Sequence, residues 1–179
     1  MDDRSEQLII LKLQSGDPEA YTELYKKYYK PIYRFVYFRV SNEDVAEDIM
    51  QEVFLKFIEV ADNQRITNAR AYLYKTAKNL VIDFYREQGK VVKVSLEDVG
   101  ELVSILGQSL TESKIDLEIA HKAIFKLKDQ WRDLILLRYV EGLEYEEIAE
   151  IFSKSQSYIR VNLHRARKEL KKIFEQSHD

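Results

Sequence analysis

Apolar residues recur at intervals of three and four along most of this chain, which is the spacing of helices with one buried face. Segments that alternate with a period of two are nearly absent. The one strand-like run, Val91, Val92 and Val94, is too short to found a sheet. The pattern therefore predicts an all-α protein.

The first helical block is predicted over residues 1–87. Asp17 before Pro18 is typical of a helix start, and Pro31 is predicted to kink or interrupt that helix. Ser41 or Asn42 is predicted to cap the next helix, and a polar loop over 62–67 precedes a long one. The expected core stripes are Ala20, Tyr21, Leu24, Tyr25, Tyr28, Tyr29; Ile32, Phe35, Val36, Val40; Val45, Ile49, Val53, Phe54, Phe57; and Ala69, Leu73, Thr76, Ala77, Leu80, Val81, Phe84.

Between residues 88 and 111 the periodicity fades, three glycines appear and the acids Glu97, Asp98 and Glu101 outnumber the lysines, which predicts a flexible linker. A second small helical domain is predicted over 112–179. Its first expected core residues are Ile115, Ile119, Ile124, Phe125, Trp131, Leu134, Ile135, Leu137 and Tyr139.

The last third of the chain predicts a helix-turn-helix. One short apolar face precedes the turn and a longer one follows it: Tyr145, Ile148, Ala149, Phe152, then Ile159, Leu163, Ala166, Leu170, Ile173. Between residues 154 and 172 a single acid, Glu169, accompanies the cations Lys154, Arg160, Arg165, Arg167, Lys168, Lys171 and Lys172. A basic stripe on a chain of net charge -3 indicates a local binding site for phosphate.

The start of such a second helix enters the DNA major groove, so residues there are candidates for contacting base edges: Gln156, Ser157, Tyr158 and Arg160. Later cations are expected to hold phosphates: Arg165, Arg167, Lys168, Lys171 and Lys172. His164 lies on the same predicted face as Arg160. Basic residues in a last helix can also simply complement its macrodipole, but their number exceeds what the dipole explains, which favours DNA.

Two further clusters leave their function open. Glu43, Asp44, Glu47, Asp48 and Glu52 lie near a predicted helix start, and the charge pattern alone favours a solvated face. The helix over 69–87 interleaves aromatic and polar residues, which suits single-stranded nucleic acid and suits half-buried packing equally. Its members are Arg70, Tyr72, Tyr74, Lys75, Lys78, Asn79, Asp83, Tyr85 and Arg86.

Composition narrows the function classes. The absence of cysteine excludes disulfides and thiolate metal sites, and 45% hydrophobic with 33% charged residues is ordinary for a soluble protein. Acids stand where a secretory signal needs a basic flank and no run reaches membrane-spanning length, so we expect a cytoplasmic protein without membrane insertion. The sequence contains no phosphate-cradling glycine loop, nucleophile with a paired base, or metal constellation, and His121, His164 and His178 are scattered. We therefore expect no enzyme activity, catalytic residue, metal or cofactor.

Six segments together resemble one family. The first block contains GDPEAY (16–21), DVAEDIMQEVF (44–54) and AYLYKTAKNLVID (71–83) followed by Arg86; the second contains LRY (137–139), YEEIA (145–149) and HRARKEL (164–170). In this order, and separated by a nonperiodic segment, they resemble a bacterial RNA polymerase sigma factor of the extracytoplasmic-function group of the sigma-70 family.

The resemblance implies a division of roles. The acidic helix would dock on the clamp helices of the RNA polymerase core, through Asp44, Glu47, Asp48, Gln51 and Glu52. The loop after it and the long helix would read and melt the minus-10 promoter element, through Asn63, Arg65, Tyr72, Lys75, Lys78, Asn79, Asp83 and Arg86. The helix-turn-helix would read the minus-35 element, through Gln156, Ser157, Tyr158, Arg160, His164, Arg165, Arg167 and Lys168. The linker would thread toward the RNA exit path, and an anti-sigma factor is a possible further partner.

Three positions depart from the family pattern. The turn over 152–156 lacks the usual glycine, so a Ser or Lys would adopt the left-handed conformation there. The segment 158–162 lacks the usual Thr-Val and a further basic residue, so base preference does not transfer. Tyr72 stands where the family often has Trp.

Two other functions fit parts of the sequence. A free-standing helix-turn-helix regulator would bind duplex DNA tightly without polymerase, usually as a dimer on a palindrome. A protein-binding scaffold would use the acidic helix and would leave the basic terminal helix unexplained.

Overall fold

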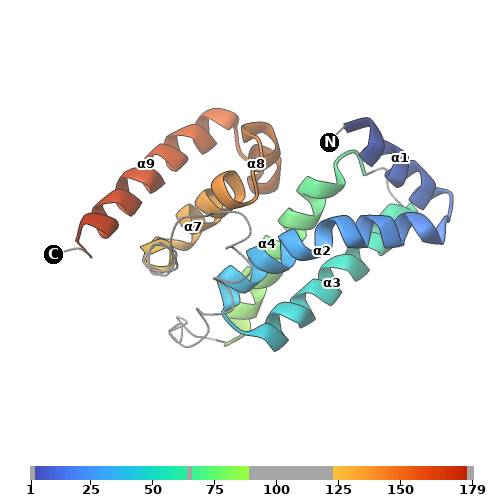
Figure 1. The fold of residues 1–179 in the computed structure, drawn as a ribbon, viewed down its shortest axis with the longest axis horizontal. Helices are drawn as coiled ribbons and strands as arrows, with labels where there is room; N and C mark the ends of the chain where they lie inside the picture. The colour runs from blue at the N-terminus through green and yellow to red at the C-terminus, as the bar shows by residue number, and fades with distance from the viewer. Residues whose placement is uncertain (1–2, 64–65, 89–122, 177–179) are drawn as a thin grey trace. The chain divides into compact units, whose positions relative to one another are not determined.

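The computed structural model describes residues 3–63, 66–88 and 123–176, and every regular element in these ranges is a helix (Figure 1). The chain divides into two compact units, Met1–Val94 and Ser95–Asp179. The all-α prediction is therefore confirmed. Gln88 is helical, and the rest of the predicted linker, the strand-like run, Ile115 and Ile119 lie outside the described residues. In the described ranges, no helix combines the length and apolar character that crossing a membrane requires.

The first unit consists of α1 (Asp3–Gln14), α2 (Pro18–Val40), α3 (Glu43–Asn63) and α4 (Ala69–Gln88). α2, α3 and α4 pack against one another, and α1 packs on α2 and α3 (Figure 1). The most buried large side chains of this core are Leu24, Ile32, Phe35, Phe38, Arg39, Met50, Phe54, Phe57, Leu73 and Tyr74. Most of the predicted stripes supply this core, which fixes the faces that α3 and α4 leave exposed.

The helix boundaries follow from local chemistry. α1 ends where Gly16 adopts a φ of 80° and the amide of Asp17 donates to the carbonyl of Lys12. The Asp17 carboxylate accepts a hydrogen bond from the amide of Glu19 at 2.9 Å, with Pro18 in the first turn of α2, as predicted. Asn42 caps α3 through its side-chain oxygen, which accepts from Val45 N–H at 2.9 Å. Ser41 instead ends α2 in the left-handed conformation.

Two helix boundaries differ from those predicted. Pro31 does not interrupt α2, because the side chains on both sides of it, Tyr28 and Ile32, are buried in the core and tertiary packing outweighs the lost backbone hydrogen bond. The predicted polar loop over 62–67 begins later than expected, since Asp62 and Asn63 still belong to α3.

The second unit contains α7 (Asp129–Ile135), a π-helical turn η2 (Leu136–Val140), α8 (Tyr145–Phe152) and α9 (Gln156–Glu175). α9 packs on α7 and α8. Part of its core joins Ala123, Leu127 and Ile135 to Ala166 and Ile173, with Ile124, Trp131 and Leu170 packed against them. The predicted burial of Tyr139 is wrong, since this residue is 52% exposed. Ile151, which no predicted stripe included, is fully buried.

The glycine-free turn between α8 and α9 closes as the sequence requires. Ser153 has φ 52° and ψ 47°, and the amide of Lys154 donates to the carbonyl of Ala149 at 3.0 Å. Ser155 then accepts a hydrogen bond from the amide of Tyr158 at 3.2 Å and caps α9. A serine thus occupies the left-handed position, at some conformational cost.

Ser153→Gly should stabilise the second unit by about 0.5–1 kcal/mol, because glycine reaches this conformation without the clash of a Cβ atom. Urea unfolding monitored by the fluorescence of Trp131, the single tryptophan of the chain, measures this change. Ser153→Ala is the matched control and should give no gain, since it keeps the Cβ atom. Equal stability of all three proteins would contradict this account.

Candidate functional site

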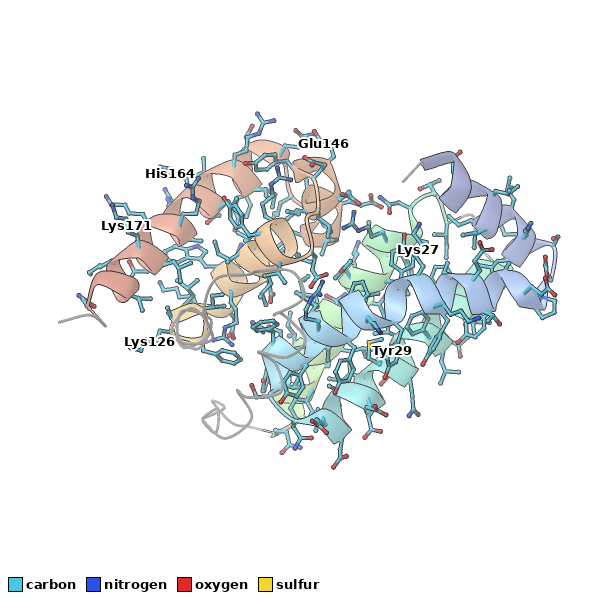
Figure 2. The ribbon with its side chains drawn as sticks, viewed as in Figure 1. Lys27, Tyr29, Lys126, Glu146, His164 and Lys171 are labelled. Atoms are coloured by element: carbon cyan, nitrogen blue, oxygen red, sulfur yellow. The ribbon has the colours of Figure 1, made fainter. Side chains whose placement is uncertain are left out.

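The predicted DNA-contacting residues of α9 lie on its exposed surface. Ser157, Arg160 and His164 are exposed, as are Arg165, Arg167 and Lys168. Gln156 is half-buried and Tyr158 is 36% exposed. His164 projects from the side of α9 that faces away from α7 (Figure 2).

The aromatic ring of Tyr145, at the start of α8, holds the guanidinium of Arg160. The Arg160 Cζ lies 5.2 Å from the ring centroid, and the Cζ of Arg138 lies 4.8 Å from the same centroid. Arg138 is fixed in turn by an ion pair with Glu144 at 3.0 Å and a hydrogen bond to the carbonyl of Leu143 at 2.6 Å. The hydrogen bond with Glu144 raises the pKa of Arg138. Arg160 is therefore oriented by residues that precede the turn.

Tyr158 is held by a residue that sequence analysis missed. Gln130 in α7 donates from Nε2 to the Tyr158 hydroxyl at 2.6 Å, and the Lys154 ammonium lies 5.8 Å from the Tyr158 ring centroid. Gln130 is 28 residues away in the chain, and no local spacing connects it to the helix-turn-helix. Only the packing of α7 on α9 reveals this contact.

The cationic side chains of α9 lie on more than one side of the helix. Arg167 lies with its Cζ 5.9 Å from the ring centroid of the exposed Tyr139. On the side of α7, a hollow of about 710 Å³ is lined by Trp131, Arg165, Lys168, Glu169, Lys171 and Lys172. A surface with several cations and one acid suits phosphate groups.

The exposed side of α3 carries the second predicted site. All of its predicted members are exposed, and we call them the acidic crest: Asp44, Glu47, Asp48, Gln51 and Glu52. One ion pair lies on it, between Glu52 and Lys56 at 3.2 Å. Beside the crest runs a groove of about 580 Å³ between α3 and α4, to which Asp48, Glu52 and Asp83 contribute.

On the other side of the crest, tyrosines from α2 form a row that sequence analysis did not identify: it placed Tyr21, Tyr25 and Tyr29 in an apolar stripe and assigned no role to Tyr33 or Tyr37. We call the row the tyrosine ladder; it consists of Tyr21, Tyr25, Tyr29, Tyr33 and Tyr37. Successive ring centroids are 6.1, 5.1, 5.9 and 6.0 Å apart, and the last two pairs are stacked at 20° and 15°. The spacing of four residues along a helix was the signal that could have revealed it.

The ladder touches α3. The ring centroid of Tyr25 lies 4.7 Å from that of Phe54, and the Tyr29 hydroxyl donates to Glu47 Oε1 at 3.5 Å. Burial, followed by the charges of Glu43 and Glu47, raises the pKa of Tyr33 to about 12. Burial and Glu47 also raise the pKa of Tyr29. The ladder is thus a neutral aromatic strip beside carboxylates.

The third predicted site lies on α4. Lys75, Asn79 and Arg86 are exposed at helical spacing, Lys78 donates to Asn79 Oδ1 at 3.3 Å, and Asp83 pairs with Arg86 at 3.1 Å. Asn63 is the last residue of α3, and Arg65 lies outside the described residues.

The tyrosines of α4 make packing contacts. Tyr72 lies edge-on to Phe57 at 5.8 Å between ring centroids and remains half-buried. Tyr74 is 1% exposed against Phe35, and the Tyr85 hydroxyl donates to the carbonyl of Arg39. The exposed polar side chains of α4 are therefore its candidate binding groups. Within the described ranges, no group of three His, Asp or Glu side chains is placed to hold a metal ion.

Comparison with known proteins identifies the family. Residues 24–91 match the family model of sigma-70 region 2, and residues 117–170 match that of sigma-70 region 4. The chain is 31% identical over 153 residues to the RNA polymerase sigma factor YlaC of Bacillus subtilis. The aligned part covers 79% of this chain and 84% of YlaC. It is 29% identical over 174 residues to the extracytoplasmic-function sigma factor SigW of the same organism, covering 91% and 93% of the two chains.

Solved structures share the fold. CnrH, solved in complex with the cytosolic domain of CnrY, matches with a TM-score of 0.75 at 18% identity over 98% of this chain and 99% of that one. The sigma factor RpoE, solved with the anti-sigma factor NepR from Bartonella quintana, matches with a TM-score of 0.64 at 22% identity over 86% and 97%.

The two helical units and their family matches define a transcription initiation factor. The chain belongs to the extracytoplasmic-function group of the sigma-70 family, whose members direct RNA polymerase to promoters.

Glu47→Gln should lower the pKa of Tyr33 below about 12, because it removes a carboxylate that disfavours the phenolate. Titration of the tyrosines by absorbance near 295 nm measures this shift. Because the folded state retains the Tyr33 proton longer than the unfolded state, stability should fall as pH rises from the ordinary pKa of tyrosine, about 10, toward 12. Glu59→Gln is the control on α3, and an identical titration of wild type and Glu47→Gln would contradict the contact.

Proposed function

We propose that the chain acts as a non-enzymatic sigma factor in the cytoplasm, in which the two units have separate tasks. Within the first unit, a domain over residues 1–87 binds the polymerase core and opens the minus-10 element. Within the second unit, a domain over residues 112–179 reads the minus-35 element. The observation that supports this division best is the opposition of charge, since α3 exposes carboxylates while α9 exposes cations. Catalysis belongs to the polymerase, and the chain needs no cofactor or metal of its own.

The acidic crest is the proposed polymerase-binding surface. Its side chains are exposed on one side of α3. On the opposite side Val53 and Phe57 are fully buried, so packing against the core holds in place the helix that carries the crest. Carboxylates in this setting favour a cationic partner surface and repel DNA. The crest thus suits the clamp helices of the core better than nucleic acid.

The exposed side of α4 is the proposed minus-10 site. Its contacts would come from Tyr72, Lys75, Lys78, Asn79, Asp83 and Arg86, together with Asn63 and Arg65 before the helix. Lys75, Lys78 and Arg86 supply positive charge for the backbone, and the amide of Asn79 supplies donors and an acceptor for a base. Capture of an unpaired base is cheapest where A·T-rich DNA unstacks easily.

The start of α9 is the proposed minus-35 reader. Gln156, Ser157, Tyr158 and Arg160 would contact base edges, while His164, Arg165, Arg167 and Lys168 would hold phosphates. The guanidinium of Arg160 can donate to two acceptors of a guanine, and its contact with Tyr145 reduces the freedom it would lose on binding.

An anti-sigma factor is a proposed further partner, by analogy with RpoE, which is solved with NepR. The segment 88–111 is proposed to connect the two units within the polymerase, toward the RNA exit path. The family assignment disfavours the alternative of a regulator that works without the core enzyme.

Run-off transcription with purified core enzyme and a promoter library tests the proposal. The chain should yield promoter-directed transcripts, and it should not bind duplex promoter DNA tightly on its own. Tight binding of the isolated chain with no transcripts on any template would favour the free-standing regulator.

The variant Asp48→Lys/Glu52→Lys should abolish association with the core, because two carboxylates that face the partner become cations. Both side chains are exposed, so circular dichroism should show an intact fold. Glu146→Lys/Glu150→Lys on α8 changes the same charge at the same spacing and should still co-purify with core. Unaltered co-purification of the α3 variant would remove the crest from the interface.

Arg160→Ala should weaken promoter binding by about 1–3 kcal/mol and relax specificity at one position of the minus-35 element, if Arg160 reads a guanine. Tyr145→Phe should retain this specificity and Tyr145→Ala should reduce it, because the phenyl ring is enough to hold the guanidinium. Binding of holoenzyme to promoters with single minus-35 substitutions measures both effects. A loss for Arg160→Ala that is equal on every promoter would assign Arg160 to a phosphate.

A further inference from the structure

Tyr139 is an exposed aromatic residue of the second unit to which the proposed function gives no role. The sequence predicted that it would be buried, yet it is 52% exposed, while Leu136 and Leu137 before it are fully buried. It lies in the π-helical turn η2, in which the amide of Glu141 donates to the carbonyl of Leu136 at 2.9 Å. Turns of this kind are uncommon and occur frequently at functional sites. Tyr139 is therefore a candidate for a role in binding.

The contact of Tyr139 with α9 indicates what this role is. The ring centroid lies 5.9 Å from the Cζ of Arg167, within the range of a cation–aromatic contact, and Arg167 is exposed. A carboxylate in place of the ring would neutralise the guanidinium and occupy its N–H donors. An aromatic ring does neither, so the contact leaves the charge and the donors of Arg167 for an anionic ligand.

The same arrangement occurs two helical turns earlier on α9. Arg160 rests on Tyr145, and Arg160 and Arg167 are seven residues apart, so they lie on one side of α9, about 10 Å from each other along its axis. Both rings precede the turn of the helix-turn-helix, and both contact arginines that follow it. Since Arg160 lies at the proposed base-reading start of α9, Arg167 on the same side is placed for the DNA backbone beyond it.

We propose that Tyr139 is a positioning residue for minus-35 binding, whose ring holds the Arg167 guanidinium in place for a DNA phosphate. This inference rests on the proposed function and adds η2 to the elements that contribute to the minus-35 site. An arginine side chain loses conformational freedom when it binds, and the ring restricts that freedom beforehand. Because the oxygens of a phosphate accept hydrogen bonds from many directions, Tyr139 affects the affinity for DNA and not the choice of sequence.

A double-mutant cycle in the full-length chain tests this proposal with Tyr139→Leu, Arg167→Ala and the combined variant. Each chain is assembled with core enzyme, and the Kd of the holoenzyme for promoter DNA is measured. Tyr139→Leu keeps apolar bulk but removes the aromatic face, so it should bind about threefold more weakly. Arg167→Ala should bind about tenfold more weakly, and the combined variant should bind no more weakly than Arg167→Ala alone. Tyr139→Phe is the matched control and should bind within about twofold of wild type, because it keeps the ring.

The cycle separates positioning from support of the fold. If Tyr139 only supported the fold, its replacement would weaken binding equally with and without Arg167. Salt dependence adds a second readout: Arg167→Ala should reduce the slope of log Kd against log salt concentration by about one, whereas Tyr139→Leu should keep the wild-type slope because the charge remains. Circular dichroism and urea unfolding establish that each variant is folded before its affinity is compared.

The outcomes separate the proposal for Tyr139 from the proposed function. If wild-type holoenzyme binds the promoter, the Tyr139 proposal is overturned by any of three results: Tyr139→Leu binds like wild type, Arg167→Ala binds like wild type, or the losses of the two variants add. A loss for Tyr139→Phe as large as that for Tyr139→Leu would also overturn it, because the hydroxyl and not the ring would then matter. In all these cases the proposed function stands. Wild-type holoenzyme that binds no promoter would overturn the proposed function and the Tyr139 proposal together.

Discussion

Burial of the apolar side of α3 between α2 and α4 is the constraint on which the first unit depends. Val53 and Phe57 are fully buried there, and Phe54 is nearly so. Because a helix has a fixed periodicity, burying these residues leaves Asp44, Glu47, Asp48, Gln51 and Glu52 outward. The same packing places α2 along one flank and α4 along the other, so the aromatic row and the polar side of α4 both border the crest. One buried stripe thus organises the surfaces that we assign to polymerase and to the melted promoter strand.

In the second unit, contacts between helices hold long, flexible side chains of α9 in defined positions. Arg160 rests on Tyr145, and Tyr158 is held by Gln130. These contacts come from α8 and α7, so the helices before the turn orient the first residues of α9. The side chains of cations farther along α9 have fewer constraints on their geometry. This suits contacts with phosphates, because the oxygens of a phosphate can accept hydrogen bonds from cationic groups in many directions.

Much of this architecture follows from the sequence. Helical periodicity, the cap at Asp17 and the left-handed serine at 153 are local properties, and each is found in the structure. The interruption that was one of the two outcomes predicted for Pro31 does not occur, because the local cost of proline is outweighed by the burial of Tyr28 and Ile32, which depends on distant helices.

The candidate site was only partly predictable. The exposed residues of α3 and α9 could be read from spacing and charge, but the contact of Gln130 with Tyr158 joins segments far apart in the chain. The sequence analysis did not identify the tyrosine ladder for another reason. Tyrosine counts as apolar in a periodicity analysis, so a row of rings at the edge of the core cannot be distinguished from the core itself until burial is known.

The most direct measurement of the central claim is site-specific photocrosslinking in a complete complex of chain, core enzyme and promoter DNA. One photoreactive residue replaces Gln51 on the acidic crest, and another replaces Ser157 at the start of α9. The account predicts that position 51 crosslinks to a polymerase subunit and position 157 to DNA of the minus-35 region. Crosslinking of position 51 to DNA, or of position 157 to polymerase alone, would contradict the division of roles between the two units.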